Sequence, residues 1–452
     1  MPTGLRAKPC LTRRLAAGAC ALAPLLLGAP SPALAANANA PANATAKAAA
    51  AKTAPAPRAP ACAWSDWTAF KGALLSADGR VIDASSPRQV TVSEGQSYAL
   101  FFALVANDRA AFDKILAWTE NNLAQGDLAA HLPAWIWGRT DIDENGAPVG
   151  ASGTSGASSA SVASAASATQ TPSATWGVID ANSASDADLW IAYTLLEAGR
   201  LWNVRRYTAI GTVMARNILR RETASLPGLG RTVLPGPTGF KLDKTSWRLN
   251  PSYVPLQVMR RFTLAMPEKE QAAWKSLLGS SAQLVNGTAP KGFSPDWVVY
   301  RAQGNKGDFG PDEPTHAESA YNAIRVYLWA GMLAHDDPAR SATLATFAPL
   351  SAFVAAHGFP PERVNTQTGE PGPNEGNGGF SAAVAPYLSA LGRTDLSDAQ
   401  VERSRARAQK SPPGYYSSVL MLFGLGYLQG LYRFDAQGRV IPAWTAQCPA
   451  AR

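Results

Sequence analysis

The stretch Ala184–Trp202, with the sequence ASDADLWIAYTLLEAGRLW, decides the fold class of this chain. After its first turn it is almost entirely apolar, and this pattern predicts a long, strongly apolar helix. Two acids, Asp186 and Asp188, fall in that first turn. One of them could simply cap the helix. Two acids in an otherwise apolar segment are harder to explain by capping, so both are also candidate site residues.

Outside this stretch, nine further segments show helical periodicity. They are 96–105, 112–123, 207–221, 252–265, 268–284, 318–334, 340–357, 381–391 and 415–431. Short strand-like pieces at 80–82 and 297–300 are minor. Residues 62–452 are therefore predicted to form one all-α domain. So many helices with so few strands favour a helical toroid over a bundle, and periodicity alone leaves the topology open.

The charge is divided unevenly between the two parts of the chain. Lys plus Arg number 41 and Asp plus Glu number 33, so the net charge is +8. Residues 1–61 contain no acid and seven basic residues, which are Arg6, Lys8, Arg13, Arg14, Lys47, Lys52 and Arg58. Residues 62–452 therefore carry 8 − 7 = +1. A nearly neutral domain argues against nucleic acid as a partner and is compatible with a neutral polymer such as a polysaccharide.

The N-terminal region is typical of an exported protein. Residues 1–36 combine a basic start, an apolar run from Leu15 to Gly28 and the cleavage pattern Ala33-Leu34-Ala35, so we expect a signal peptide. Residues 37–61 are rich in Ala and Pro and are expected to be a flexible linker. A second low-complexity stretch, at about 140–175, is expected to be a surface insertion. No stable membrane span is expected after cleavage, and the protein is expected in the periplasm or secreted.

Cleavage would leave two cysteines, Cys62 and Cys448, near the two ends of the domain. In an exported protein, two remaining cysteines are expected to form a disulfide bond. Such a bond would close a loop of almost the whole domain and so restrict the unfolded chain.

Motifs for several common chemistries are missing from the sequence. It has no phosphate-binding loop, no dinucleotide fingerprint and no nucleophile elbow around a serine. The four histidines, which are His131, His316, His335 and His357, do not have metal-ligand spacing. We therefore expect neither a cofactor nor a metal site.

Acids and aromatic residues remain as candidate site residues. Glu94 begins the apolar segment at 96–105, and Gly95 beside it would let another chain or a ligand come close. Helix stabilisation is the alternative explanation for Glu94. Aromatic residues near predicted loops or helix ends could stack on sugar rings, although most aromatics are core residues. These are Trp135, Trp137, Trp176, Trp247, Tyr253, Tyr415 and Tyr416. Acids and aromatics without a cofactor fit glycoside hydrolysis.

Five segments of the chain resemble glycoside hydrolase family 8. They are 93–123, 180–202 (DANSASDADLWIAYTLLEAGRLW), 247–253 (WRLNPSY), 289–300 (APKGFSPDWVVY) and 321–332 (YNAIRVYLWAGM). Within that family the sequence is most similar to the periplasmic endoglucanases found beside bacterial cellulose synthase. The resemblance implies an (α/α)6 barrel and hydrolysis of β-1,4-glucan with inversion, without a cofactor.

The resemblance also implies roles for individual residues. Glu94 takes the place of the general acid, and Asp186 that of the acid that holds the distorted sugar. Arg325 and Tyr253 take the places of residues that position the attacking water. Trp247 and Tyr416 would line a glucan-binding cleft. Trp135, Trp137, Tyr415 and Asp188 are further candidates for binding the substrate.

One position departs from the family pattern. In family cellulases the general base is an Asp in the context Tyr-Asp-Ala-x-Arg, whereas this chain has Tyr321-Asn322-Ala323-Ile324-Arg325. A neutral amide can orient water but does not accept its proton at neutral pH. Either another carboxylate acts as base, or the protein binds glucan with little or no turnover, or the substitution was introduced to trap substrate. The nearest acids in the sequence are Asp312, Glu313 and Glu318.

The sequence therefore predicts an endo-β-1,4-glucanase that acts on cellulose-type glucan during bacterial cellulose synthesis and secretion. The alternative is a catalytically impaired glucan-binding protein with the same fold. A scaffold subunit associated with the cellulose synthase complex is a third class, and it would need no acids in a cleft.

Overall fold

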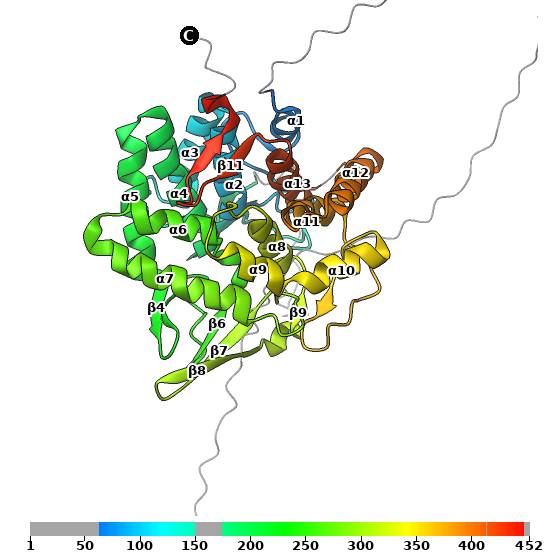
Figure 1. Cartoon of the computed structure of the whole chain (residues 1–452). Coiled ribbons are helices and arrows are strands. Elements are labelled where there is room, and N and C mark those ends of the chain that lie inside the picture. Colours follow the sequence, from blue (N-terminus) through cyan, green and yellow to red (C-terminus); the bar gives the residue numbers. More distant parts are fainter. Residues whose placement is uncertain (1–62, 150–173, 413, 447–452) are drawn as a thin grey trace, which may run out of the picture. The chain divides into compact units, whose positions relative to one another are not determined.

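The computed structural model describes residues 63–149, 174–412 and 414–446, and this part of the chain is mostly helical (Figure 1). Within these residues there are 13 α-helices, joined by short strands and loops. The helices are α1 (Ser65–Leu74), α2 (Ser93–Val105), α3 (Arg109–Leu123), α4 (Ser185–Trp202), α5 (Arg205–Arg221), α6 (Leu256–Ala265), α7 (Glu268–Gly287), α8 (Ala323–Gly331), α9 (Arg340–Thr346), α10 (Ala348–His357), α11 (Gly378–Ala390), α12 (Thr394–Lys410) and α13 (Tyr415–Leu428).

Six helices form a closed inner ring. In order around the ring they are α2, α4, α6, α8, α11 and α13; each contacts the next, and α13 contacts α2. For α4 and α8 the sequence explains this position, because a helix that is apolar on all sides is stable only when it is surrounded by protein. Every residue of α4 from Ser185 to Gly199 is buried, and so is every residue of α8.

The remaining helices pack outside this ring. α3 contacts α2, α5 contacts α4, α7 contacts α6, α12 contacts α11, and α1 contacts α13. α9 contacts both α8 and α7. These outer helices keep a polar face, as in α5, where the buried positions include Tyr207, Met214 and Ile218 while Arg205 and Arg206 are exposed. The alternation of an apolar and an amphipathic helix along the chain therefore builds two concentric layers.

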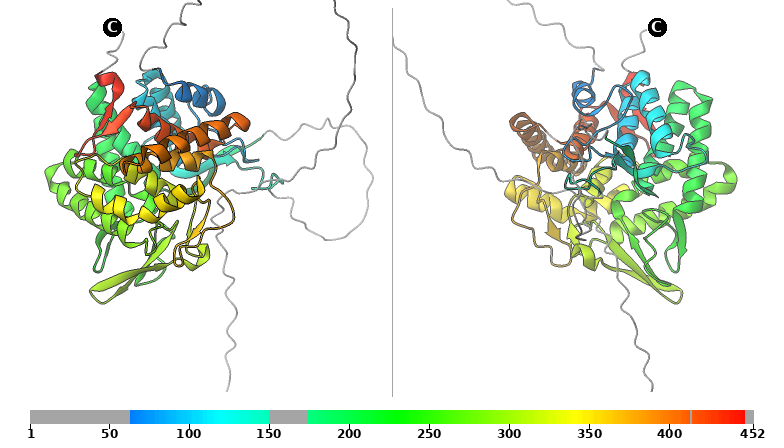
Figure 2. Two further views of the ribbon diagram at one scale, coloured as in Figure 1. Left: turned by 45° about the vertical axis from the view of Figure 1, so that its right-hand side comes forward. Right: turned by 180° about the vertical axis from the view of Figure 1, so that it is seen from behind.

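The strands are short and lie at the ends of the helices. Figure 2, together with Figure 1, places the sheet β6–β7–β8 at the lower end of the views and the hairpin β11–β12 at the upper end. The strands are β1 (Thr91–Val92), β2 (Ala134–Arg139), β3 (Trp176–Ser183), β4 (Thr223–Leu226), β5 (Gly230–Val233), β6 (Ser246–Leu249), β7 (Val298–Gln303), β8 (Lys306–Pro311), β9 (Glu318–Ser319), β10 (Val364–Asn365), β11 (Tyr432–Phe434) and β12 (Val440–Pro442).

Two sheets hold segments that matter for the site. In the sheet β1–β2–β3, Trp137 pairs with Val178 and Arg139 with Trp176. In the sheet β6–β7–β8, Trp247 pairs with Tyr300. All strand pairs described here are antiparallel.

The structure corrects several predicted helices. α1 and α12 were not expected; α12 buries only Ser397, Gln400 and Ser404, so it lacks the apolar stripe that marks a helix in a sequence. The single helix expected at 340–357 is divided at Phe347, with Pro349 in the first turn of α10. A proline fits a first turn because the amide that it lacks has no helical partner there.

The segment expected to be one helix over 318–334 begins as a strand. β9 covers Glu318–Ser319, and the helix α8 starts only at Ala323. The signal peptide at 1–36, the linker at 37–61, the pair Cys62 and Cys448, and most of the insertion (150–173) lie outside the described residues. Among the described helices, none combines the length and the apolar character needed to cross a membrane.

Candidate active site

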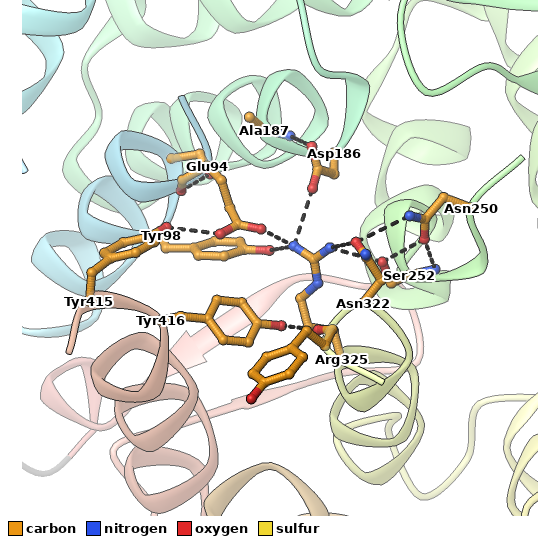
Figure 3. Close-up of polar contacts among 12 residues, drawn as sticks. Glu94, Tyr98, Asp186, Ala187, Asn250, Ser252, Asn322, Arg325, Tyr415 and Tyr416 are labelled. Atoms are coloured by element: carbon orange, nitrogen blue, oxygen red, sulfur yellow. Dashed lines mark hydrogen bonds and ion pairs between the residues drawn. The ribbon is translucent and has the colours of Figure 1, made fainter. Parts of the chain in front are cut away.

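The guanidinium of Arg325 is the centre of a polar cluster at the N-terminal ends of α2, α4 and α8 (Figure 3). Arg325 is buried, and its Nη1 donates to Glu94 Oε2, to Tyr98 OH at 3.2 Å and to Asp186 Oδ2 at 3.3 Å. One cation thus holds two carboxylates that are 92 positions apart in the chain, from 94 to 186. The structure brings together three of the four charged site residues that the sequence nominated, which are Glu94, Asp186 and Arg325.

The other side of the same guanidinium contacts neutral groups. Its Nη2 donates to Asn322 Oδ1 at 2.7 Å and to Ser252 Oγ at 3.0 Å. Asn250 Nδ2 also donates to Asn322 Oδ1, at 3.2 Å. The oxygen of the Asn322 amide is therefore directed toward Arg325 and Asn250, as Figure 3 shows.

Glu94 is placed by the first turn of α2 and by a close neighbour from α13. Tyr415 OH donates to Glu94 Oε1 at 2.9 Å. A Cβ on Gly95 would lie 3.0 Å from Tyr415 Cε2 and 3.2 Å from its hydroxyl. Glycine at position 95 therefore allows the tyrosine to reach Glu94, which agrees with the close approach expected there. The side chain of Glu94 stays 19% exposed, so solvent or a ligand can reach this acid.

Asp186 lies deeper than Glu94, at the start of α4. Its Oδ1 accepts the amide of Ala187 at 2.8 Å, and its Oδ2 faces Arg325. Burial raises the pKa of Asp186 to about 6; Arg325 acts in the opposite direction, and the charge of Glu94 raises the pKa further. Asp186 can therefore exchange a proton near neutral pH, which an ordinary aspartate does not.

Asp188 has a different environment from the one expected. Its carboxyl group is fully buried and contacts Glu222, which follows α5, instead of Arg325. Ser183 Oγ donates to Glu222 Oε1 at 2.5 Å, while Glu222 Oε2 and both Asp188 oxygens have no donor within the described residues. A substrate contact for Asp188 has no place in this arrangement, because its carboxyl group has no surface accessible to a ligand.

The pair formed by Asp188 and Glu222 has to hold a proton. Burial, followed by the charge of Glu222, raises the pKa of Asp188 well above its usual value. Burial likewise raises the pKa of Glu222 to about 8, although the neighbouring Ser183 and Asp188 act against the shift. Two buried carboxylates without a cation in contact cannot both stay ionised, so one proton is shared at neutral pH.

The start of α8, which carries both Asn322 and Arg325, is fixed by Asp296. Its Oδ1 accepts the backbone amides of Ala320 at 2.8 Å, Asn322 at 3.1 Å and Ala323 at 2.8 Å. These amides have no partner within the helix, so a carboxylate from a distant loop provides their acceptor. Asp296 and Asn322 are both partly exposed.

The predicted aromatic residues near the cluster take different positions. The guanidinium of Arg325 lies over the ring of Tyr253, 5.7 Å from its centre, and Tyr416 OH donates to the backbone oxygen of Tyr321. Burial raises the pKa of Tyr253, Tyr415 and Tyr416, so their hydroxyl groups stay protonated and can donate. Trp247 is only 5% exposed, which leaves little of its ring for a sugar to stack on.

Trp135, Trp137 and Trp176 lie on the sheet β1–β2–β3. Trp137 is covered by Trp176, whose ring stacks on it at 5.4 Å, and by the guanidinium of Arg80 at 4.4 Å. Trp135 and Trp176 are 37% and 41% exposed, so these two rings are available to a ligand. Within the part of the chain that the structure describes, no hydrogen bond, ion pair or ring contact joins these three tryptophans to Arg325.

Several residues of the cluster were not nominated from the sequence. They are Tyr98, Asn250, Ser252, Asp296, Tyr321 and Glu222. Some of these residues could have been predicted from features of the sequence. Tyr98 follows Glu94 by four residues and so lies on the same helix face. Asn250, Ser252 and Asp296 fall inside segments that carry the family resemblance, whereas nothing in the sequence marks Glu222.

The cluster can support acid–base chemistry by protein side chains. It offers one partly exposed carboxylate, Glu94, one buried acid that titrates near neutral pH, Asp186, and a cation that binds both. Within the described residues, no group of three or more His, Cys, Asp or Glu side chains could hold a metal ion.

Comparison with known proteins connects this geometry to one family. The sequence profile described as "Glycosyl hydrolases family 8" matches residues 44–170 and 168–430, which together span most of the chain. An endoglucanase of Escherichia coli O157:H7 is 44% identical over 391 residues, covering 86% of this chain and 93% of that protein. An endoglucanase of Xanthomonas axonopodis pv. citri is 43% identical over 394 residues, covering 86% and 91%.

Solved structures give the same result. The endo-1,4-D-glucanase from Vibrio fischeri superposes with a TM-score of 0.73 at 43% identity, covering 85% of this chain and 100% of that chain. A family 8 endoglucanase from Klebsiella pneumoniae superposes with a TM-score of 0.60 at 25% identity, covering 81% and 99%. With its profile match, its sequence relatives and its structural neighbours in agreement, this chain belongs to glycosyl hydrolase family 8.

Proposed function

We propose that this protein is an endo-β-1,4-glucanase, which hydrolyses internal bonds of a cellulose-type glucan with inversion. One observation carries the proposal: Glu94 and Asp186, from different helices, converge on the single cation Arg325. The names of the relatives, which are endoglucanases, support the same activity. The closed ring of six inner helices supports assigning the fold to the (α/α)6 barrel class.

In this proposal Glu94 is the general acid. It is partly exposed and held from two sides, by Arg325 and by Tyr415, so its carboxyl group has a defined direction. A positioned acid protonates the glycosidic oxygen as the bond to the leaving sugar breaks. Asp186 would bind the distorted sugar at the cleavage point, and Arg325 with Tyr253 would position the attacking water.

A second candidate function is glucan binding with little turnover. The observation that favours it is Asn322, whose amide oxygen accepts from Arg325 and Asn250 in the place where the family resemblance expects a carboxylate. An amide can keep the shape and the hydrogen bonds of the site without removing a proton from water. The Glu94 side of the cluster would then serve binding alone.

We place this activity in the periplasm, in connection with cellulose synthesis. The basic leader, the small net charge of residues 62–452 and the two cysteines outside the leader support export. The family resemblance supports a role in trimming cellulose during its secretion. Expression of the full chain with fractionation of the cells tests the location: the proposal expects the shortened protein in the periplasm or medium, and full-length protein confined to the cytoplasm would contradict it.

The products of the reaction test the proposed activity. An endo-acting enzyme lowers the viscosity of soluble carboxymethyl cellulose before many reducing ends appear, and an inverting enzyme first releases the α-anomer from cello-oligosaccharides, as proton NMR can detect. Glucan retarded in affinity electrophoresis without shortening would instead support the second candidate. Neither binding nor cleavage would contradict both.

A further inference from the structure

The site contains a partly exposed acid but has an amide at the expected position of the base. The inference drawn from this difference rests on the proposed function, because only a hydrolase that inverts needs a carboxylate to activate water. Asn322 cannot fill that role, since its amide does not accept a proton at neutral pH. If the chain turns over glucan, the base is another residue near Asn322.

Asp296 is the carboxylate in contact with Asn322. All three of its hydrogen bonds to backbone amides fall on one oxygen, Oδ1. These amides leave the second oxygen, Oδ2, unused, and the side chain of Asn322 also forms a hydrogen bond with Asp296. Asp296 is partly exposed, so water can reach this residue.

A chain of contacts leads from Glu94 through Arg325 and Asn322 to Asp296. Nη1 of Arg325 binds Glu94, Nη2 binds the side chain of Asn322, and the backbone of Asn322 binds Asp296. An inverting hydrolase needs its acid and its base on opposite faces of the sugar ring, with room for a water molecule next to the base. In the chain of contacts, the guanidinium and the amide lie between the two carboxylates, as an acid and a base on opposite faces of a sugar would require.

We propose that Asp296 is the general base of this enzyme and that Asn322 orients the water from which Asp296 takes a proton. Burial raises the pKa of Asp296, while the amides of Ala323, Ala320 and Asn322 act in the opposite direction. A carboxylate with a raised pKa is a stronger base than an ordinary aspartate and is still ionised when the pH exceeds that pKa.

The proposed step breaks one bond, forms one bond and transfers two protons. The water oxygen forms a bond to the anomeric carbon while the bond from that carbon to the glycosidic oxygen breaks, and the electron pair of that bond stays on the departing oxygen. This oxygen takes the proton of Glu94. One proton of the attacking water moves to Asp296 Oδ2. Both carboxyl groups return to their starting states by exchange with solvent.

Two of the three acids nearest to Asn322 in the sequence, Asp312 and Glu318, have other partners, and the third, Glu313, is exposed. Asp312 is buried and accepts two hydrogen bonds from Arg248, at 3.0 and 2.9 Å. Glu318 forms an ion pair with Arg363. Glu362, which the fold brings near Tyr321, accepts from Tyr321 OH at 2.7 Å and from Asn374 at 2.9 Å. Asp296 is the acid whose contacts reach Asn322 itself.

The test variant is Asp296→Asn. Asparagine keeps the oxygen that accepts the three amides, and asparagine is itself a common helix cap, so α8 should still begin at the same place. Loss of the base should lower kcat on carboxymethyl cellulose by on the order of 10²–10⁴-fold, with the Kd for cellopentaose unchanged. Glu313→Gln is the control. Glu313 is an exposed acid between β8 and β9, and this variant should keep the parent rate.

A second variant separates the loss of a base from damage to the fold. Asp296→Asn combined with Asn322→Asp restores a carboxylate at the family position, so it should regain activity that Asp296→Asn has lost. An inactive double variant, beside an active Asn322→Asp, would overturn the proposal by showing that Asp296 matters for structure. Parent activity retained in Asp296→Asn would also overturn it.

The same set distinguishes failure of this inference from failure of the proposed function. A parent without turnover whose Asn322→Asp variant cleaves glucan would overturn Asp296 as base and leave the second candidate function. A parent and an Asn322→Asp variant that both fail to cleave or bind glucan would contradict the proposed function itself. The pH–rate profile adds a further check. The pH at the midpoint of its rising limb should differ between the parent and the double variant, because a different carboxylate acts as base in each.

Discussion

Asp186 and Asp188 are two residues apart in the first turn of α4, yet their surroundings are opposite. Asp186 faces Arg325, a cation that it shares with the partly exposed Glu94. Asp188 faces Glu222, a second acid, with neither solvent nor a cation in contact with its carboxyl oxygens. The same residue type in one helical turn therefore belongs to a charged cluster in one case and to a proton-sharing pair in the other.

This difference shows what makes a carboxylate available for chemistry. A buried acid stays ionised only when a cation or several donors balance its charge, and otherwise it keeps a proton. Arg325 provides that balance for Glu94 and Asp186, and the partial exposure of Glu94 gives a substrate access. Asp188 and Glu222 have no such balance, so their contribution is to the packing of β3, α4 and the end of α5.

Replacing the cation should have the largest effect on stability. Arg325→Met would leave Glu94 and Asp186 facing each other without a cation, and thus in the situation of Asp188 and Glu222. Removing one partner of a buried ion pair costs about 3–5 kcal/mol of unfolding free energy. Urea denaturation at pH 7 measures this loss.

Arg363→Met provides the control. Arg363 pairs with Glu318, but the two side chains are 43% and 33% exposed, so the same change should cost no more than about 1 kcal/mol. Equal losses in the two variants would show that the site around Arg325 is not the balanced cluster described here.

The proton-sharing pair should make stability depend on pH. Glu222 has a folded pKa of about 8, above its usual 4.5, so the folded state keeps a proton that the unfolded chain releases from about pH 4.5 upward. Stability should therefore fall as the pH rises from about 4.5 to 8 and level off above. Asp186, with its pKa raised to about 6, adds to the fall over the lower part of this range.

Asp188→Asn removes the need for the shared proton, because the amide of asparagine can donate to the Glu222 carboxylate. Thermal melting of the parent and of this variant, from pH 5 to pH 8, should show a smaller fall in Tm for the variant. The charges nearest to the pair, Asp186 and Arg221, are the same in both proteins. If Tm falls equally with pH in the parent and in Asp188→Asn, Asp188 and Glu222 do not share a proton.

A smaller and more local effect is expected at Gly95. In Gly95→Ala the new Cβ would lie 3.0 Å from Tyr415 Cε2 and would push the tyrosine away from Glu94. We expect kcat on carboxymethyl cellulose to fall while stability changes by less than about 1 kcal/mol, since alanine also favours the helix. A variant with the parent kcat would show that the contact between Tyr415 and Glu94 is not needed.

The smallest effect is expected from Tyr415→Phe, which keeps the ring and removes one hydrogen bond of 2.9 Å to Glu94. Glu94 still has Arg325 and solvent as partners, so the loss should be about 1 kcal/mol in transition-state stabilisation, or roughly fivefold in kcat/KM. Steady-state kinetics can resolve this change. A larger loss of activity in Tyr415→Phe than in Gly95→Ala would contradict the expectation that Tyr415→Phe has the smaller effect.

The sequence predicted the apolar inner helices well, because burial on all sides leaves a strong apolar signal, as in Ala184–Trp202. It did not predict α12, whose buried positions are Ser397, Gln400 and Ser404. It also could not show that the helix expected at 318–334 starts only at Ala323, since the acceptor for the first amides is Asp296, more than 20 positions away.

For the candidate site, local patterns indicated Glu94, Gly95 and Asp186, and the family resemblance added Arg325. The structure places all four in one cluster. The separation of Asp186 from Asp188 could not be predicted, because it depends on which distant side chain meets each acid. Glu222 and Asp296 were missed for the same reason: their partners come from other elements, and no spacing in the sequence records such a contact.

The most direct test of the distinction between the two acids of α4 is reducing-end release from carboxymethyl cellulose by the purified protein, beside Glu94→Gln and Asp188→Asn. We expect turnover by the parent, a loss on the order of 10²–10⁴-fold in Glu94→Gln and retained turnover in Asp188→Asn at neutral pH. Glu94→Gln with the rate of the parent would contradict this expectation, because the cluster around Arg325 would then not contain the acid.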